Sequence, residues 1–148
     1  MNTPPARAPV LDGLRVLDRT SGIAGPYCTK LLADAGADVV KVEAGAGDPL
    51  RGQGTGALFE FLNASKRSVT DDASLLAAAD VVVCDEPLTD EERRHARPAV
   101  VAVSITPFGR CGPWAATRPW TEFTLQAACG SIGQRPASDG AGAGRNPG

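Results

Sequence analysis

The sequence predicts an α/β fold in which helices cover both faces of a parallel sheet. Short runs of apolar and β-branched residues recur along the chain, and helical patterns separate most of them. Nearly continuous apolar runs of this kind are typical of strands that are buried on both faces. Because strand and helix alternate, a parallel sheet is favoured, and its ligands are expected beyond the carboxyl ends of the strands.

Each element follows from a local pattern. The five predicted strands are residues 14–18, 38–43, 67–70, 80–84 and 99–105. The four predicted helices are residues 27–35, 72–79, 89–96 and 121–129. The first helix has Tyr27, Leu31 and Leu32 on one face, which is therefore expected to be its packing face. The third helix begins with Thr89 and has Glu92 three residues later, the pattern of a capping box.

The fourth helix is amphipathic, and Phe123, Ala127 and Leu125 are its expected buried positions. Three other segments lack a regular pattern. Residues 1–11 are expected to be a disordered, proline-rich lead-in, residues 44–56 a glycine-rich loop, and residues 135–148 a flexible Gly/Ala-rich tail. A loop as long as residues 44–56 inside a compact domain is usually functional or disordered. We therefore expect one domain over residues 12–134.

Composition excludes several classes of protein. The 148-residue chain has a net charge of −2, which gives no overall attraction to nucleic acid or to an anionic membrane. No apolar run approaches the ~20 residues that span a bilayer. The first residues carry no export pattern, so a cytoplasmic location is expected.

The four cysteines are expected to be reduced thiols, most of which fill small spaces in the core. They are widely spaced, with no C-x-x-C pair, and the single histidine, His95, lies in a charged run of a surface helix. We expect no metal site and no cysteine nucleophile paired with a histidine base.

The bend after the first strand is the most informative local feature. A glycine-rich turn at residues 20–25 precedes Pro26, which suits the first turn of a helix because its missing N–H needs no partner there. The bend therefore lies at a helix N-terminus, where free N–H groups and the helix dipole favour an anion. A phosphate or carboxylate is the expected ligand.

Eight motifs, taken in order, resemble one family. They are DGLRVLD at residues 12–18, AGPYCT at 24–29, LLAD at 31–34, GADVVKVE at 36–43, GDPLR at 47–51, LNASKRSV at 62–69, ADVVV at 79–83 and FGRCGPW at 108–114. Together they resemble the N-terminal part of a family III CoA-transferase, the family of formyl-CoA and carnitine CoA-transferases and α-methylacyl-CoA racemase. The resemblance implies a Rossmann-like CoA-binding domain that is incomplete relative to the full-length family fold.

The resemblance also implies substrates and partners. The intact enzyme is expected to be an interlocked homodimer of much longer chains that acts on an acyl-CoA and a carboxylic acid. CoA is then a substrate, and no covalently bound cofactor is expected. Nucleic acid and membrane are not expected partners.

Site residues follow from the same resemblance. In relatives, the segments that match Ile23, Ala24 and Gly25, and the loop from Asn63 to Lys66, contact the CoA nucleotide. The segment that matches Thr106, Phe108 and Gly109 lies along the bound CoA. The residues themselves also suggest that Lys66 and Arg67 hold a terminal phosphate through charge-assisted hydrogen bonds, the alternative being a solvated basic pair.

Four residues depart from the family pattern. Ile23 replaces a polar residue of some relatives, so only backbone contact is expected there. Ala44 stands where some relatives have a phosphate-binding arginine. Asp85 and Glu86 stand where an Asn-Phe pair commonly lines the CoA site, and they would repel a polyphosphate unless they point away.

No catalytic residue is expected within this chain. The resemblance implies an aspartate that attacks the acyl thioester to form a mixed anhydride, and its place falls after the glycine-rich stretch. Asp139 is the acid of that stretch, in a context that resembles a turn. Thr121 occupies the place of the racemase histidine, and Glu122 is expected to be a solvated residue of a first helical turn.

The leading functional hypothesis is the CoA-binding N-terminal portion of a CoA-transferase, inactive alone. Its tail has linker composition, which favours truncation. One alternative is a freestanding nucleotide-binding or interaction module without catalysis. Another is an NAD-binding domain, although the G-x-G-x-x-G spacing is missing and Glu43 is the one feature in its favour.

Overall fold

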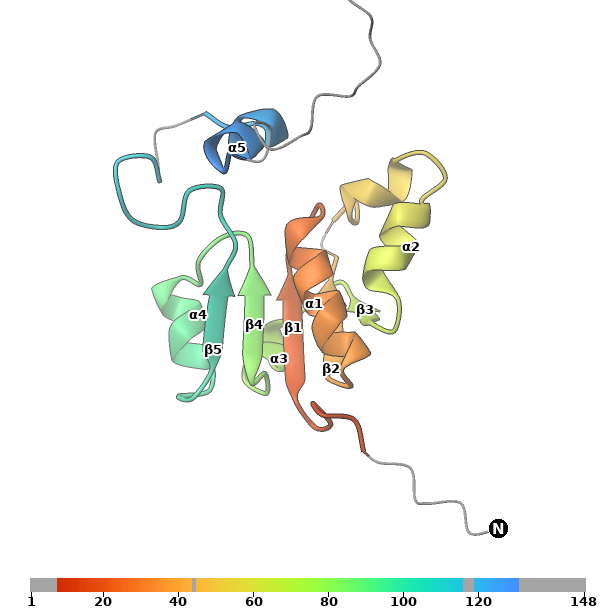
Figure 1. Cartoon of the computed structure of the whole chain (residues 1–148). Helices are drawn as coiled ribbons and strands as arrows, with labels where there is room; N and C mark the ends of the chain where they lie inside the picture. The colour runs from red at the N-terminus through yellow and green to blue at the C-terminus, as the bar shows by residue number, and fades with distance from the viewer. Residues whose placement is uncertain (1–7, 44, 116–118, 131–148) are drawn as a thin grey trace, which may run out of the picture. The chain divides into compact units, whose positions relative to one another are not determined.

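A parallel five-stranded sheet with helices on both faces forms the body of the protein (Figure 1), as the sequence predicts. The computed structural model describes residues 8–43, 45–115 and 119–130. It divides into two compact units, Met1–Arg110 and Cys111–Gly148. The order of the strands is β3-β2-β1-β4-β5. Their bounds are β1 Arg15–Arg19, β2 Asp38–Val42, β3 Arg67–Val69, β4 Val81–Cys84 and β5 Val101–Ser104.

This strand order places the topological switch point between β1 and β4. From β1 the chain winds outward to β2 and β3, then returns to the other side of β1 to form β4 and β5. The parallel register pairs Asp18 with both Lys41 and Val83. In open parallel sheets the crevice beyond the carboxyl ends at such a point is the usual ligand site.

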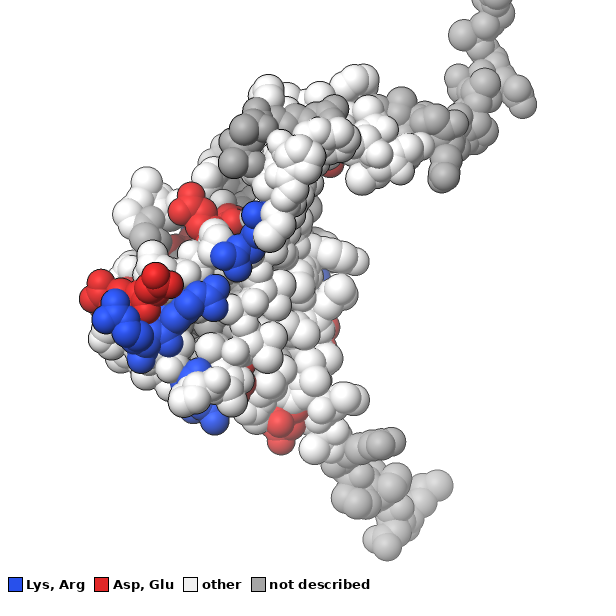
Figure 2. All heavy atoms as spheres, turned by 90° about the vertical axis from the view of Figure 1, so that its left-hand side faces the viewer, with Lys and Arg blue, Asp and Glu red and all other residues white. Residues whose placement is uncertain are grey.

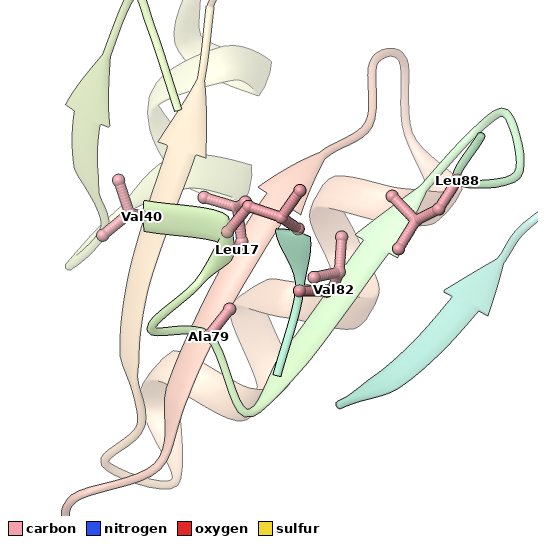
Figure 3. Close-up of a cluster of buried hydrophobic side chains, with 7 residues drawn as sticks. Leu17, Val40, Ala79, Val82 and Leu88 are labelled. Carbon is pink, nitrogen blue, oxygen red and sulfur yellow. The ribbon is translucent and has the colours of Figure 1, made fainter. Parts of the chain in front are cut away.

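Successive residues of β1 pack into two core clusters on opposite faces of the sheet. Val16 packs in a cluster with Val39 and Val83 against α1, Ala24–Asp34. Leu17 belongs to a second cluster on the opposite face, and Figure 3 labels five of its side chains, Leu17, Val40, Ala79, Val82 and Leu88. Two short helices border this second cluster, α3 Ala73–Leu76 and α4 Asp90–His95. The alternation follows from the period of two of a strand.

The structure contains two short helical elements that were not predicted. A short helix, α2 Ala57–Asn63, follows the 3-10 turn η1, Pro49–Gly52, which lies inside the expected loop. The pattern of α2 is hard to recognise because its N-cap is Gly56, which has a φ of 77° and no side chain to cap the helix. Leu50, Phe59 and Leu62 form a small cluster of their own.

The packing face expected for α1 is wrong for Tyr27 and Leu31, whereas Leu32 is partly buried against the core cluster that contains Val16. Tyr27 is 47% exposed and Leu31 is 52% exposed, whereas the buried residues of the helix are Gly25, Pro26 and Thr29. The first half of the helix therefore packs through Gly25, Pro26 and Thr29, while Tyr27 and Leu31 face outward.

The capping box of α4 is confirmed. Thr89 accepts a hydrogen bond from the Glu92 N–H at 3.2 Å, and the Glu92 carboxylate accepts from the Thr89 N–H at 2.7 Å. Figure 2 shows basic and acidic side chains next to one another on the side of the molecule that carries α4. That face therefore presents no continuous basic surface.

The second unit holds α5, Glu122–Ala128, which has Thr121 as its N-cap. Glu122 is exposed in the first turn, as expected. The expected buried positions are wrong for Phe123, which is 71% exposed, and for Ala127, while Leu125 is half-buried. Within the described residues, no helix is long and apolar enough to cross a membrane. Asp139 and the tail at residues 135–148 lie outside the described residues.

Candidate functional site

The turn between β1 and α1 lies at the carboxyl edge of the sheet. Its helix begins at Ala24 after the N-cap residue Ile23, which makes no side-chain cap hydrogen bond. The first turn holds no acidic residue. The first N–H groups of a helix have no intrahelical acceptor, so this end of α1 offers donors and a partial positive charge to a ligand.

Gly25 is required by close packing rather than by an unusual backbone angle. A Cβ atom placed on Gly25 would lie 2.2 Å from both the Cβ and the Oγ1 of Thr20. Since both are heavy atoms of a buried side chain, they have no room to retreat. The turn folds back on the helix because this position carries no side chain.

A buried carboxylate lies beneath the turn. Asp18 lies near the carboxyl end of β1, with its side chain toward α1, and is 0% exposed. It accepts hydrogen bonds from the hydroxyls of Thr20 and Thr29, each at 2.5 Å, and pairs with the Lys66 ammonium at 3.0 Å. Burial alone would raise the pKa of Asp18, but the two hydroxyls and then Lys66 lower it below its ordinary value. Asp18 is therefore ionised, and its carboxylate is bound by Thr20, Thr29 and Lys66 of the protein itself.

Lys66 is the cation of this network. Burial lowers the pKa of Lys66, and the adjacent Asp18 carboxylate offsets only part of that effect. The side chain is 1% exposed. Lys66 is therefore not an exposed basic side chain that is accessible to a phosphate.

A second buried pair supports the other side of the turn. The Lys41 ammonium donates to the Thr20 carbonyl at 2.8 Å and lies 2.9 Å from Asp48 Oδ2. Both side chains are nearly inaccessible, at 2% and 1% exposure. Asp48 also caps η1 by accepting from the Leu50 N–H at 2.9 Å. The loop after β2 is thereby held against the turn.

Glu43, at the end of β2, is fully engaged. Its carboxylate accepts two hydrogen bonds from Arg51, at 2.6 and 2.8 Å, and one from the Ser68 hydroxyl at 2.7 Å. Arg51 foremost, then Ser68, holds the pKa of Glu43 at about 2. Arg51 also stacks over the ring of Phe59 at 3.9 Å. Glu43, the residue that favoured an NAD site, is therefore bound by other side chains of the protein.

Two open hollows lie at this edge. One, of about 430 Å³, lies beyond β4 and is lined by Arg19, Cys84, Asp85, Glu86, Pro87, Thr89 and Glu92. The other, of about 180 Å³, reaches toward β2 and is lined by Arg19, Thr20, Ser21, Lys41, Val42, Glu43, Gly47, Asp48, Pro49 and Asp85. Arg19 and Asp85 line both, so the two hollows adjoin at the switch point.

Asp85 does not point away from the turn. Its carboxylate accepts from the Ser21 N–H at 2.8 Å and from the Ser21 hydroxyl at 2.9 Å. The Asp85 carboxylate therefore accepts from one backbone N–H of the turn, that of Ser21. Because the side chain is partly exposed at the shared border of the hollows, its charge opposes an incoming anion.

Most residues expected to contact CoA lie on segments that flank the turn or follow a strand at this edge. Ile23 and Ala24 are exposed at the start of α1, and Asn63 lies at the end of α2, where its side chain contacts the Lys66 ammonium at 2.9 Å. The segment with Thr106, Phe108 and Gly109 follows β5 at the same edge. Thr106 Oγ1 is buried without a hydrogen-bond partner among the described residues.

Arg67 lies elsewhere. Successive residues of an extended chain point to opposite faces, so Lys66 reaches toward α1 while Arg67 pairs with Asp38 at 2.6 Å at the amino end of β2. Arg67 lines a separate hollow there with Arg15 and Leu75. The two side chains therefore do not converge on one phosphate in this structure. Ala44 lies outside the described residues.

Sequence reasoning did not identify the buried polar layer formed by Asp18, Thr29, Lys41 and Asp48. A signal was present, because a charged residue inside an apolar strand is costly unless it is paired. Both VLD in β1 and VVKV in β2 contain one. The partners could not be found from the sequence because they lie on different elements.

Comparison with known proteins identifies the family. The family model described as CoA-transferase family III matches residues 11–144. The chain belongs to CoA-transferase family III. Two similar members are the succinyl-CoA:mesaconate CoA-transferase of Haloarcula hispanica, 47% identical over 49% of this chain, and the formyl-CoA:oxalate CoA-transferase of Streptomyces coelicolor, 35% identical over 90% of it.

Solved structures of similar proteins share the fold. The Mycobacterium tuberculosis protein Rv3272 superimposes with a TM-score of 0.75 at 32% identity, over 90% of this chain and 42% of that one. A CAIB/BAIF family protein from Brucella suis gives 0.74 at 32% identity, over 84% and 40%. The chain spans 24% and 38% of the lengths of the two transferases named above.

Proposed function

We propose that this chain provides the CoA-binding part of an enzyme that moves CoA between carboxylic acids. The observation that carries the proposal is the uncapped N-terminus of α1 at the switch point of the sheet, in a member of this family. Donors at a helix N-terminus suit the phosphates of CoA. The adjoining hollows provide room for an extended ligand beside the turn.

The residues of this proposal are grouped by element. Ile23, Ala24 and Gly25 offer backbone N–H groups, Asn63 ends α2, and Lys66 lies just before β3 with its ammonium bound to protein groups. Thr106, Phe108 and Gly109 lie along the ligand after β5. Arg67 would join them only by leaving Asp38.

The transfer step needs an aspartate nucleophile. We do not assign this role to any of the residues that the structure describes. Its carboxylate would attack the thioester carbonyl of an acyl-CoA, forming an acyl-aspartyl anhydride and releasing CoA as the thiolate. The thiolate would then attack the aspartyl carbonyl, releasing the donor acid and leaving an aspartyl-CoA thioester. An acceptor carboxylate would reverse the two steps. Near the turn, Asp18, Asp48 and Asp85 are already engaged by Lys66, Lys41 and Ser21.

We further propose that the full-length enzyme is a cytoplasmic homodimer and that this chain binds CoA without transferring it. Incubation with an acyl-CoA, then hydroxylamine, followed by mass spectrometry tests the second part. We expect no hydroxamate on any acid. A hydroxamate on Asp139 or Glu122 would show that the chain is an enzyme by itself.

Calorimetric titration of the chain with CoA tests the binding proposal. We expect CoA to bind and NAD to give no heat of binding. Ile23→Asp and Ile23→Asn form a matched pair, since both side chains can cap the helix and only one carries a charge. We expect about tenfold weaker CoA binding for Ile23→Asp than for Ile23→Asn, because the aspartate competes with the phosphate. Equal affinities would contradict a site at this helix end.

A further inference from the structure

The Lys66 ammonium makes three contacts that use all of its donors. It donates to Asp18 Oδ2 at 3.0 Å, to the Pro26 carbonyl at 2.9 Å and to Asn63 Oδ1 at 2.9 Å. A lysine ammonium has three N–H donors and no acceptor. With a side chain that is 1% exposed, it has no free donor for a phosphate.

The three contacts join three elements of the candidate site. Asp18 lies near the carboxyl end of β1, Pro26 belongs to the first turn of α1, and Asn63 ends α2. The contact with Pro26 fixes a peptide plane at the helical end of the turn. Since peptide groups are planar and trans, fixing a carbonyl also fixes the direction of the next N–H.

The other end of the turn is held in the same way. Lys41 donates to the Thr20 carbonyl at 2.8 Å, and the Ser21 N–H of that peptide points to Asp85. The free donors of the turn lie between these two restrained peptides. Their direction therefore depends on both ends.

We propose that Lys66 is a positioning residue that holds the first turn of α1 for its anionic ligand, rather than a residue that contacts the phosphate. This inference rests on the proposed CoA site and names how Lys66 serves it. Asp18 keeps the ammonium charged and in place, and Lys41 is the corresponding restraint at Thr20.

Two roles must be separated by the test. If Lys66 only neutralises the buried Asp18, removing both charges together restores the site. If it holds the Pro26 carbonyl, removing both charges restores stability but leaves the turn unrestrained. The informative variants are therefore Lys66→Met and the double variant Asp18→Asn with Lys66→Met. Lys30→Met is the matched control, because it removes one lysine charge that pairs with Asp34 of the same helix and not with the turn.

The first readout is amide hydrogen exchange, measured by mass spectrometry, over the peptide spanning residues 20–27. It needs no ligand. We expect about tenfold faster exchange in Lys66→Met and in the double variant, as expected from losing one charge-assisted hydrogen bond, and no change in Lys30→Met. Unchanged exchange in the double variant would overturn the inference, whatever the CoA affinity.

The second readout is CoA affinity in the same variants at two salt concentrations. We expect the double variant to bind about tenfold more weakly, with the salt dependence of the wild type, because no phosphate contact is lost. Wild-type affinity in the double variant would overturn the inference, and so would a weaker salt dependence, which marks a direct contact. Failure of the wild-type chain to bind CoA would overturn the proposed function, while the exchange result would still decide the role of Lys66.

Discussion

Asp18 and Asp85 both lie beside the turn at residues 20–26, but only one of them is neutralised. Asp18 faces Lys66 and two hydroxyls in a site closed to solvent. Asp85 accepts two hydrogen bonds from Ser21, which carries no charge. The first carboxylate stabilises the turn, while the second leaves a negative charge at the entrance to the proposed site.

Asp85→Asn is expected to strengthen CoA binding. The amide can still accept from Ser21, so the change removes the charge and keeps the contact. We expect about two- to fivefold higher affinity, the size of an exposed charge contact of about 0.2–1 kcal/mol. Calorimetric titration at low salt measures it.

Asp12→Asn is the control for this change, because Asp12 is exposed before β1 at the opposite edge of the sheet. It alters net charge by the same amount and should leave the affinity unchanged. An equal gain in both variants would show a general effect of net charge instead of a local one.

Glu43 is expected to link stability to pH. Its pKa is about 2 in the folded protein, below its ordinary value of 4.5, chiefly through Arg51. A carboxylate with a depressed pKa contributes stability above pH 4.5, and this contribution is lost as the pH falls toward 2. Because Arg51 is half exposed, we expect about 1–2 kcal/mol after screening.

Urea unfolding of the wild type and Glu43→Gln between pH 5 and pH 2 measures this contribution. The two curves should converge as the pH falls, because the wild-type carboxylate then becomes protonated. Glu60→Gln, an exposed acid on α2, should run parallel to the wild type. Parallel curves for Glu43→Gln would contradict the assigned pKa.

At the scale of elements, α1 shows how a helix can be positioned by small residues. Its buried face consists of Gly25, Pro26 and Thr29, so the helix axis approaches the sheet closely. That approach brings Thr29 within hydrogen-bond distance of Asp18. The same close approach puts the N-terminus of α1 at the edge where β1 ends.

Gly25→Ala is expected to destabilise this arrangement. The new Cβ would lie 2.2 Å from Thr20 and would push the turn away from the helix. We expect a loss of about 1–3 kcal/mol in the free energy of unfolding, typical of overpacking. Chemical unfolding measures it.

Gly52→Ala is the matched control, since a Cβ at Gly52 meets nothing within 4 Å and its φ is ordinary. It should change stability by less than about 0.5 kcal/mol, as for a surface substitution. Equal losses in the two variants would contradict the packing argument.

At the scale of the whole molecule, several large apolar side chains face solvent. Ile23, Tyr27 and Leu31 recur every four residues along α1 and are each about half exposed, and Phe61 of α2 is 56% exposed. Phe61 contacts Lys30 of α1 at 5.0 Å, so the two helices are neighbours. Contiguous apolar surfaces of this kind are uncommon on isolated domains.

The chain is therefore expected to bind a hydrophobic dye in the folded state. Replacing Tyr27 and Leu31 together with serine should lower the dye fluorescence clearly, since both belong to the exposed face of α1. Val10→Ser is the control, because Val10 is 90% exposed but lies apart on the chain before β1. No dye fluorescence in the wild type, with sedimentation as a monomer, would contradict this expectation.

The sequence by itself determined the class of fold and the place of the turn. Apolar runs, glycine and proline act over a few residues, so the strands were found within two residues of their observed ends and the α4 capping box was identified. The ordered motifs determined the family. These features are local, or are patterns along the chain, and need no knowledge of contacts.

Only the tertiary structure decided which side chains meet. It placed Lys66 and Arg67 on opposite faces, buried the four charges of Asp18, Lys41, Asp48 and Lys66, and turned Tyr27 and Leu31 outward. The physical reason is that a buried charge is stable only beside its partner, and these partners come from elements up to 48 residues apart in the sequence. Local patterns contain no information about such pairs, so the role of Lys66 could be inferred only after the strands and helices were assembled.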